Sequence, residues 1–416
     1  MMNRTLRALV GGVIGASVGV GVGSAVLVPA QQATAQVRIA LSAGRGGASM
    51  SPISKSAFRD YTKLLSLNDD QVQSGQELFD AYRAAFKVAQ EEHQGKMDSI
   101  QETMRDTGDF QASVKDMQEA TTAFSEKSSS LEASFMGDLR AILTDAQSEQ
   151  WPAVERHRRR ETGLRMGFYS GAAVDLLSMV EKLKADPGTP EFAALMSQYE
   201  LELDRRIQDA SRERADIAKD AEKNDPMDFE AQQERMKKMG ESSKTIRDLN
   251  RDYVNRLGSL MGAEQRAALE AEYKKRSFPN VYDEAHIEQC LKAATGFADL
   301  DTTQKETLNT LYEQYRRDVQ PLNEAWARAI NDAEEDAGGS IAMEMNKWNA
   351  GGASEGVKKG RADRKELDAK FKQRLEEVLS PTQRERLPSK KSRDGDRGGL
   401  QIRIGGPGHG AEEEDE

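Results

Sequence analysis

The sequence predicts an all-α protein made of three tandem helical-hairpin units of about 118 residues, each with long antiparallel amphipathic helices. First, one stretch occurs three times, with Gln147, Gln265 and Gln383 at the same place in two equal steps of 118 residues. Second, apolar side chains recur at steps of three and four residues, the spacing of a helix buried on one face. Third, 31% of residues are charged, only 6% are aromatic and the mean hydropathy is −0.72, typical of solvated helices with a thin apolar seam.

The N-terminus predicts an exported protein. Residues 1–35 have the layout of a signal peptide, because Arg4 and Arg7 precede a long apolar run and Ala33-Thr34-Ala35 offers a cleavage site. The alternative is a retained N-terminal anchor, since glycine recurs every four residues in a run close to spanning length. Either interpretation places the rest of the chain in the periplasm or envelope, soluble or N-terminally anchored. Residues 36–54, rich in Gly, Ser and Ala, predict a flexible linker.

Three helical units are predicted to follow, at 55–161, 162–279 and 280–389. Each begins with a connector helix, at 55–65, 164–184 and 283–295. Two long helices then form an antiparallel hairpin, because a short break returns the second along the apolar seam of the first. A short terminal helix ends each unit. Residues 390–416, rich in glycine and ending in five acidic residues, predict a disordered acidic tail.

Residues in the apolar seam of the first long helix can be matched with residues of the other two units by a fixed shift in sequence number. Its members are Val72, Phe79, Tyr82, Phe86, Ala89, His93, Met97, Ile100 and Met104. A shift of 233 residues matches His93 with Trp326 and Met97 with Ile330, and a shift of 117 leads to Ile217 in the second unit. Breaks between the paired helices are predicted at Gly108, at 224–226 and around 351–352, and Pro321 is predicted to kink its helix.

The repeated stretch contains a capping box. In the run that begins with Leu143, Thr144 can accept from the amide of Gln147, whose side chain can reach back to the Thr144 amide. Similar motifs run from Leu67 to Gln71, from Leu300 to Gln304, and from Leu379 through Ser380 to Gln383. In the middle unit Gly262 replaces the capping hydroxyl before Gln265, and the first long helix begins instead at Thr189-Pro190. The motif is interpreted as structural.

Motifs of this kind, bracketing helical units in an exported chain, resemble the Spy/CpxP family of periplasmic proteins, also called the LTxxQ-motif family. The resemblance covers roughly residues 55–388 as three tandem copies. It implies cradle-shaped, antiparallel helical dimers that bind unfolded polypeptides without ATP, or that report envelope and metal stress. The fusion of three units departs from the family pattern. Two units could pair within the chain and leave the third to form a homodimer.

Two sets of side chains are candidates for contact with such clients. Methionines are adaptable apolar contacts, and the candidates are Met117, Met136, Met236 and Met239. A basic cluster ends the first unit and could face acidic clients or an anionic membrane surface; it comprises Arg156, Arg158, Arg159 and Arg160. The alternatives are that the methionines belong to the buried seams and that the arginines complement a helix C-terminus.

The sequence does not predict an enzyme. It contains no phosphate-binding glycine loop, no His-Glu-x-x-His and no Gly-x-Ser-x-Gly, so no catalytic residue and no cofactor is proposed. The net charge of −11, with both signs interleaved, does not suggest a nucleic-acid partner. No metal site is predicted, because the histidines are far apart in sequence. Cys290 is interpreted as a buried free thiol or an incidental one.

Taken together, these features lead us to expect an exported, ATP-independent, chaperone-like or envelope-stress protein that binds unfolded polypeptides. One alternative is a structural, coiled-coil-like envelope scaffold. A second is a periplasmic metal-stress sensor. A continuous apolar surface favours the chaperone, whereas a uniformly charged surface favours the scaffold.

Overall fold

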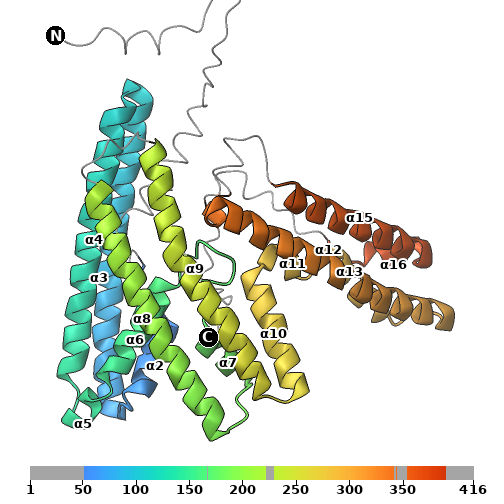
Figure 1. Ribbon diagram of the computed structural model, residues 1–416, viewed down its shortest axis with the longest axis horizontal. Helices are drawn as coiled ribbons and strands as arrows, with labels where there is room; N and C mark the ends of the chain where they lie inside the picture. Colours follow the sequence, from blue (N-terminus) through green and yellow to red (C-terminus); the bar gives the residue numbers. More distant parts are fainter. Residues whose placement is uncertain (1–50, 166, 222–228, 342, 344–353, 390–416) are drawn as a thin grey trace, which may run out of the picture.

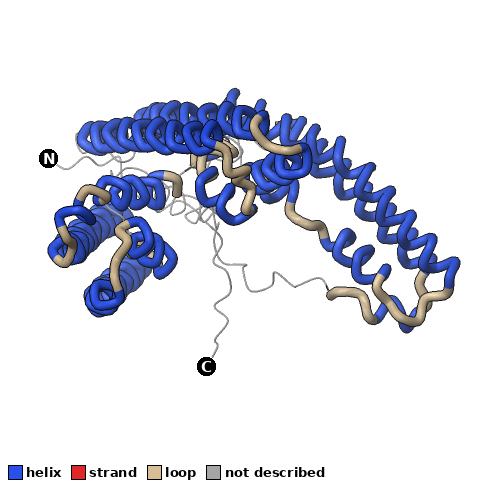
Figure 2. Tube along the Cα trace, turned by 90° about the horizontal axis from the view of Figure 1, so that it is seen from below, coloured by secondary structure: helices blue, strands red, loops and turns tan. Residues whose placement is uncertain are grey.

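The computed structural model describes residues 51–165, 167–221, 229–341, 343 and 354–389. This part consists of α-helices joined by loops, which confirms the predicted all-α class (Figures 1 and 2). The predicted signal or anchor, most of the linker, the acidic tail and the breaks at 224–226 and 351–352 lie outside the described residues. Among the described helices, none has an apolar stretch of the length and purity that crossing a bilayer requires.

Three pairs of long helices dominate the fold (Figure 1). They are α3 (Asp69–Thr107) with α4 (Phe110–Ala141), α8 (Pro190–Ala221) with α9 (Phe229–Ser259), and α13 (Thr302–Ala337) with α15 (Glu355–Val378). The connector helices are α2 (Lys55–Leu64), α7 (Leu176–Leu183) and α12 (His286–Thr295). The remaining helices are α5 (Asp145–Ser148), α6 (Trp151–Gly163), α10 (Ala263–Ser277), α11 (Pro279–Tyr282) and α16 (Pro381–Glu385).

Each hairpin packs around one aromatic pair at matched positions. The ring centroids lie 5.1 Å apart for Tyr82 and Phe135, 5.1 Å for Tyr199 and Tyr253, and 5.3 Å for Tyr315 and Phe371. In every pair one ring comes from the outgoing helix and the other from the returning helix. The sequence spacing therefore predicts real contacts, since positions about 118 residues apart make the same contact three times.

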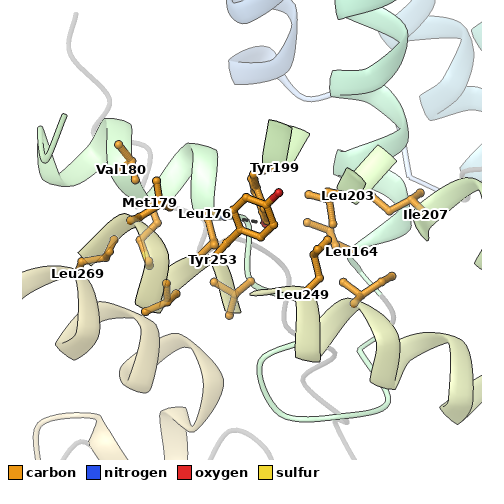
Figure 3. Close-up of a cluster of buried hydrophobic side chains, with 14 of the residues drawn as sticks. Leu164, Leu176, Met179, Val180, Tyr199, Leu203, Ile207, Leu249, Tyr253 and Leu269 are labelled. Atoms are coloured by element: carbon orange, nitrogen blue, oxygen red, sulfur yellow. Dashed lines mark hydrogen bonds between the residues drawn. The ribbon is translucent and has the colours of Figure 1, made fainter. Parts of the chain in front are cut away.

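The tyrosine of each pair also holds the segment that enters the connector helix. The Tyr82 hydroxyl accepts a hydrogen bond from the Ile53 amide at 3.1 Å. The Tyr199 hydroxyl donates to the Asn250 side chain at 2.8 Å, and the Asn250 amide donates to two carbonyls of the loop before α7. These groups lie inside the second core, where Figure 3 shows Tyr199 and Tyr253 among leucine side chains. In the third hairpin the link is indirect, because Arg364 donates to the Tyr315 hydroxyl at 3.1 Å and to the carbonyl of Val281, which precedes α12, at 3.2 Å.

The repeated motifs do form capping boxes, as predicted. Four helices begin with one, and the capping residues are Asn68, Thr144, Asp301 and Ser380. Gly262 starts α10 without a side-chain cap, and the Phe192 amide donates to the Thr189 hydroxyl at the start of α8. The break at Gly108 is also as predicted, with φ at +67° in the left-handed region that glycine tolerates. Pro321 lies inside α13.

Two predictions about the connecting segments are wrong. Ile53, placed in the flexible linker, is completely buried in the first core. The predicted helix 164–184 is mostly a loop, because α6 ends at Gly163 and α7 begins at Leu176. Asp175 caps α7 by accepting from the Leu177 amide at 3.0 Å, and this cap fixes the start of the helix. The loop before it instead packs against the second hairpin.

Candidate functional site

The arginine cluster is an internal joint, which corrects the expectation of a patch that faces clients or a membrane. Arg158 is buried and bonds to Glu132 and Glu161 of its own unit. Arg159 and Arg160 reach into the second unit, with N–O distances of 2.7 Å to Asp204 and 2.9 Å to Asp175. Arg156 pairs with Glu200 in the same region, at 3.5 Å. The charges hold α6 between the first two hairpins and are neutralised there.

The candidate methionines do not form an exposed surface either. Met117, Met236 and Met239 have only 4%, 5% and 4% of their surface exposed, and Met136 packs half-buried against the first core. Their burial follows from their helical spacing, which places them between paired helices. The seam interpretation therefore holds for these four residues.

Large exposed apolar side chains are scattered over the described surface. Those with more than a third of their surface exposed lie on α2, α3 and α8 and just after α9, and are Leu64, Val72, Val88, Leu201 and Leu260. Isolated residues of this kind are normal for a soluble surface. The continuous apolar cradle that the family resemblance implies is therefore not present in the described part of the chain.

The outer halves of the second and third hairpins are covered by chain that precedes their connector helices. In the second, Phe168 and Tyr169 pack over Ile217, of which 6% is exposed. In the third, Phe278 and Val281 pack with Trp326, of which 8% is exposed. In both hairpins a loop or short helix thus completes a seam that two helices alone leave open.

The first hairpin differs from the other two in this respect. Its matched side chains, His93 for Trp326 and Ile100 for Ile217, are half-buried. We define the distal seam as a half-buried row on α3 together with two buried residues on α4. It comprises His93, Met97, Ile100 and Met104 of α3 and Val114 and Met117 of α4. The four α3 side chains are all half-buried, and of these His93 packs on Phe124 of the first core. The distal seam is the candidate functional site.

At one end of the distal seam, His93 acts as a neutral aromatic ring and not as a charged group. Its ring stacks on Phe124, with centroids 4.7 Å apart and planes 10° from parallel. Burial, assisted by the positive charge of Lys96, lowers the pKa of His93 and favours the neutral imidazole. The methionines beyond it are unbranched and polarizable, so they can adapt to differently shaped apolar partners.

The other chemically reactive groups do not form a competing site. Cys290 is a buried free thiol, which confirms that interpretation, and its sulfur lies 3.0 Å from Nδ1 of His286. Burial raises the pKa of the Cys290 thiol, so the contact does not activate it as a nucleophile. Within the described ranges, no three side chains of metal-binding type converge. The fourth histidine, His409, lies outside those ranges.

The chain was also compared with known proteins. Comparisons with models of protein families, with curated proteins and with solved structures found no match. The functional argument therefore depends on the residues and contacts of this chain.

Proposed function

We propose that this chain is an exported protein that binds extended, partly apolar polypeptide segments without ATP, through the distal seam of its first hairpin. The observation that supports the proposal is the difference between matched positions. Ile217 and Trp326 are buried under other parts of the chain, whereas Ile100 and His93 are only half-buried. The resemblance of the capping motifs to the Spy/CpxP family, whose members bind unfolded clients, agrees with this proposal.

The distal seam can hold only the apolar part of a segment. At about 100° per residue, Glu91 and Glu102 lie on the face of α3 opposite the seam, so these exposed carboxylates do not flank it. A polypeptide with spaced apolar side chains would bury its apolar atoms in the seam, and this burial carries the affinity.

The test is suppression of aggregation of a reduced, unfolded model protein by the full chain without ATP. Ile100→Glu places a charge in the seam and should abolish protection. Val88→Glu is the matched control, because Val88 lies on the same helix and 55% of it is exposed outside the seam. Circular dichroism should show the same helix content for both variants. Equal protection by both variants, or no protection by the wild-type chain at several-fold excess, would overturn the proposal.

The scattered exposed apolar residues favour a second function, that of an envelope scaffold. Many solvent-facing charges pair along single helices, as do Lys87 with Glu91 and Lys115 with Glu119. Such faces suit a solvated spacer whose helices meet a partner's helices. A scaffold would bind no unfolded polypeptide in the assay above and would retain one elongated particle shape by small-angle scattering.

A further inference from the structure

We infer that residues 37–50 of this chain occupy its own distal seam as an intramolecular ligand. The inference deepens the proposed function, because it names a segment that competes with clients for the same surface. The observations that carry it are how the other two hairpins are covered, the direction in which the chain leaves α2, the length of the segment and its chemistry.

The chain itself provides the precedent twice. In the second unit, Phe168 and Tyr169 precede the connector helix α7 and cover Ile217 of the hairpin that follows. In the third, Phe278 precedes the connector helix α12 and packs on Trp326. The segment that precedes α2 has the same place in the first unit. Residues 37–50 belong to that segment.

The chain leaves α2 in the right direction. Phe58 stacks on Phe79, with ring centroids 4.6 Å apart, whereas Ile53 bonds further along α3 to Tyr82 and Arg83, at 3.1 and 3.4 Å. The helix α2 therefore runs antiparallel to α3. Proceeding from Ile53 towards lower residue numbers leads along α3 to higher residue numbers, which is where the distal seam begins.

The length of the segment is sufficient. Twelve residues separate Leu41 from Ile53, and an extended chain of that length spans about 40 Å. Along α3, 22 residues separate Tyr82 from Met104, a distance of about 33 Å at the helical rise. An extended segment that begins at Ile53 can thus reach the far end of the seam.

The chemistry of the segment matches that of the seam. Val37, Ile39 and Leu41 alternate with other residues, so in an extended chain they lie on one edge. A tethered segment has an effective concentration of the order of millimolar, so even weak contacts would keep the seam occupied.

Disulfide trapping in the full chain tests the contact directly. In a Cys290→Ser background, Ile39→Cys is combined with Met97→Cys or with Met104→Cys, and the matched control combines Ile39→Cys with Val88→Cys. Mild oxidation should give an intramolecular disulfide with at least one seam cysteine and much less with position 88, measured by non-reducing electrophoresis and mass spectrometry. Equal trapping in all three variants, or trapping only at position 88, would overturn the inference, as would no trapping in any.

A second measurement separates this inference from the proposed function. The triple variant Val37→Asp, Ile39→Asp, Leu41→Asp should release the segment and raise client affinity about tenfold if the seam is nine-tenths occupied. Disulfide trapping without any client binding, in either the wild type or the triple variant, would support the intramolecular contact and refute the chaperone function. Client protection without disulfide trapping would support the function and refute the contact.

Discussion

Gln71 and Gln147 form a reciprocal amide pair: each side-chain N–H donates to the other side-chain oxygen at 2.8 Å, although 76 residues separate them. Each glutamine also completes the capping box of its own helix. Gln71 donates in addition to the carbonyl of Ile142, at 2.8 Å. The pair therefore ties the start of α3 to the end of α4 and closes the base of the first hairpin. Gln304 donates to Gln383 at 3.2 Å in the third hairpin.

Gln147→Ala should destabilise the first hairpin by about 1–2 kcal/mol, because both a helix cap and an amide pair are lost. The double variant with Gln71→Ala should cost less than the sum of the single variants, with a coupling energy of about 0.5–1.5 kcal/mol. Hydrogen exchange of the α3 and α4 amides measures the change. Gln265→Ala is the control, because α10 begins without a side-chain cap. Strict additivity of the two substitutions would show that the glutamines act independently.

Arg158→Met should destabilise the packing of α6 on the first hairpin by about 3–5 kcal/mol, because it leaves the poorly exposed Glu132 and Glu161 without their cation. Arg159→Met, at a side chain that is 35% exposed, should cost no more than about 1 kcal/mol. Thermal unfolding at one protein concentration compares the two variants. A smaller loss for Arg158→Met than for Arg159→Met would contradict the assignment of Arg158 as the buried cation that Glu132 and Glu161 share.

The contact between the second and third hairpins should weaken as the pH rises above the ordinary pKa range of a glutamate. Glu334 accepts from the amide and hydroxyl of Ser170, at 2.9 and 2.7 Å, and burial raises the pKa of Glu334 despite these bonds and the nearby Arg247 and Arg251. A raised folded-state pKa means that this group's stabilising contribution is fully present below its unfolded pKa and is lost as the pH rises through the folded pKa. Lys244 and Arg247 lower the pKa of Glu335, so Glu335 stays ionised above that range.

Glu334→Gln keeps one acceptor oxygen for the Ser170 amide, can donate its own N–H to the Ser170 hydroxyl, and removes the titration. We expect this variant to be at least as stable as the wild type at pH 8 and to lose the pH dependence of hydrogen exchange in residues 334–341. Glu335→Gln is the control, which should leave the slope with pH unchanged. An unaltered slope in Glu334→Gln would assign the pH dependence to another group.

Gly240→Ala should separate α9 from the end of α13. A Cβ atom at position 240 would overlap the backbone oxygen of Gly338, a contact that no rotamer change can relieve. The expected cost is about 1–3 kcal/mol, concentrated in the contact between the second and third hairpins. Gly95→Ala is the matched control, since nothing lies within 4 Å of its added Cβ, and it should stabilise α3 by about 0.5–1 kcal/mol. Hydrogen exchange of residues 334–341 reports the difference.

The sequence predicts the hairpins well because their determinants are local and periodic. A seam at steps of three and four residues must be covered, and a short break leaves one simple way to cover it. Capping boxes span only four residues, so Thr144 and Gln147 reveal theirs directly. The pairing of Gln71 with Gln147 is not local, since it depends on where α4 ends after a hairpin of more than 70 residues. The capping motifs alone contain no sign of it.

The contacts between neighbouring hairpins are not local either, so the sequence alone does not predict them. A run of arginines shows charge but not its partners, and Asp175 and Asp204 lie in the next unit. The loop before α7 contains apolar residues at nearly helical spacing, but Asn250 binds its carbonyls from a distant helix. The spacing of its apolar residues predicts the part of the distal seam that lies on α3. Its incomplete cover becomes visible only when Ile100 is compared with Ile217 in space.

The two joints of the array differ, although the hairpins resemble one another. The first is built from ion pairs of α6 with α7 and α8, whereas the second uses Glu334 and Glu335 at the end of α13 against the loop before α7 and against α9. The hairpins are thus comparable parts joined by unlike couplings. The array consequently has a polarity: exchanging the order of two hairpins would preserve every core and break both couplings.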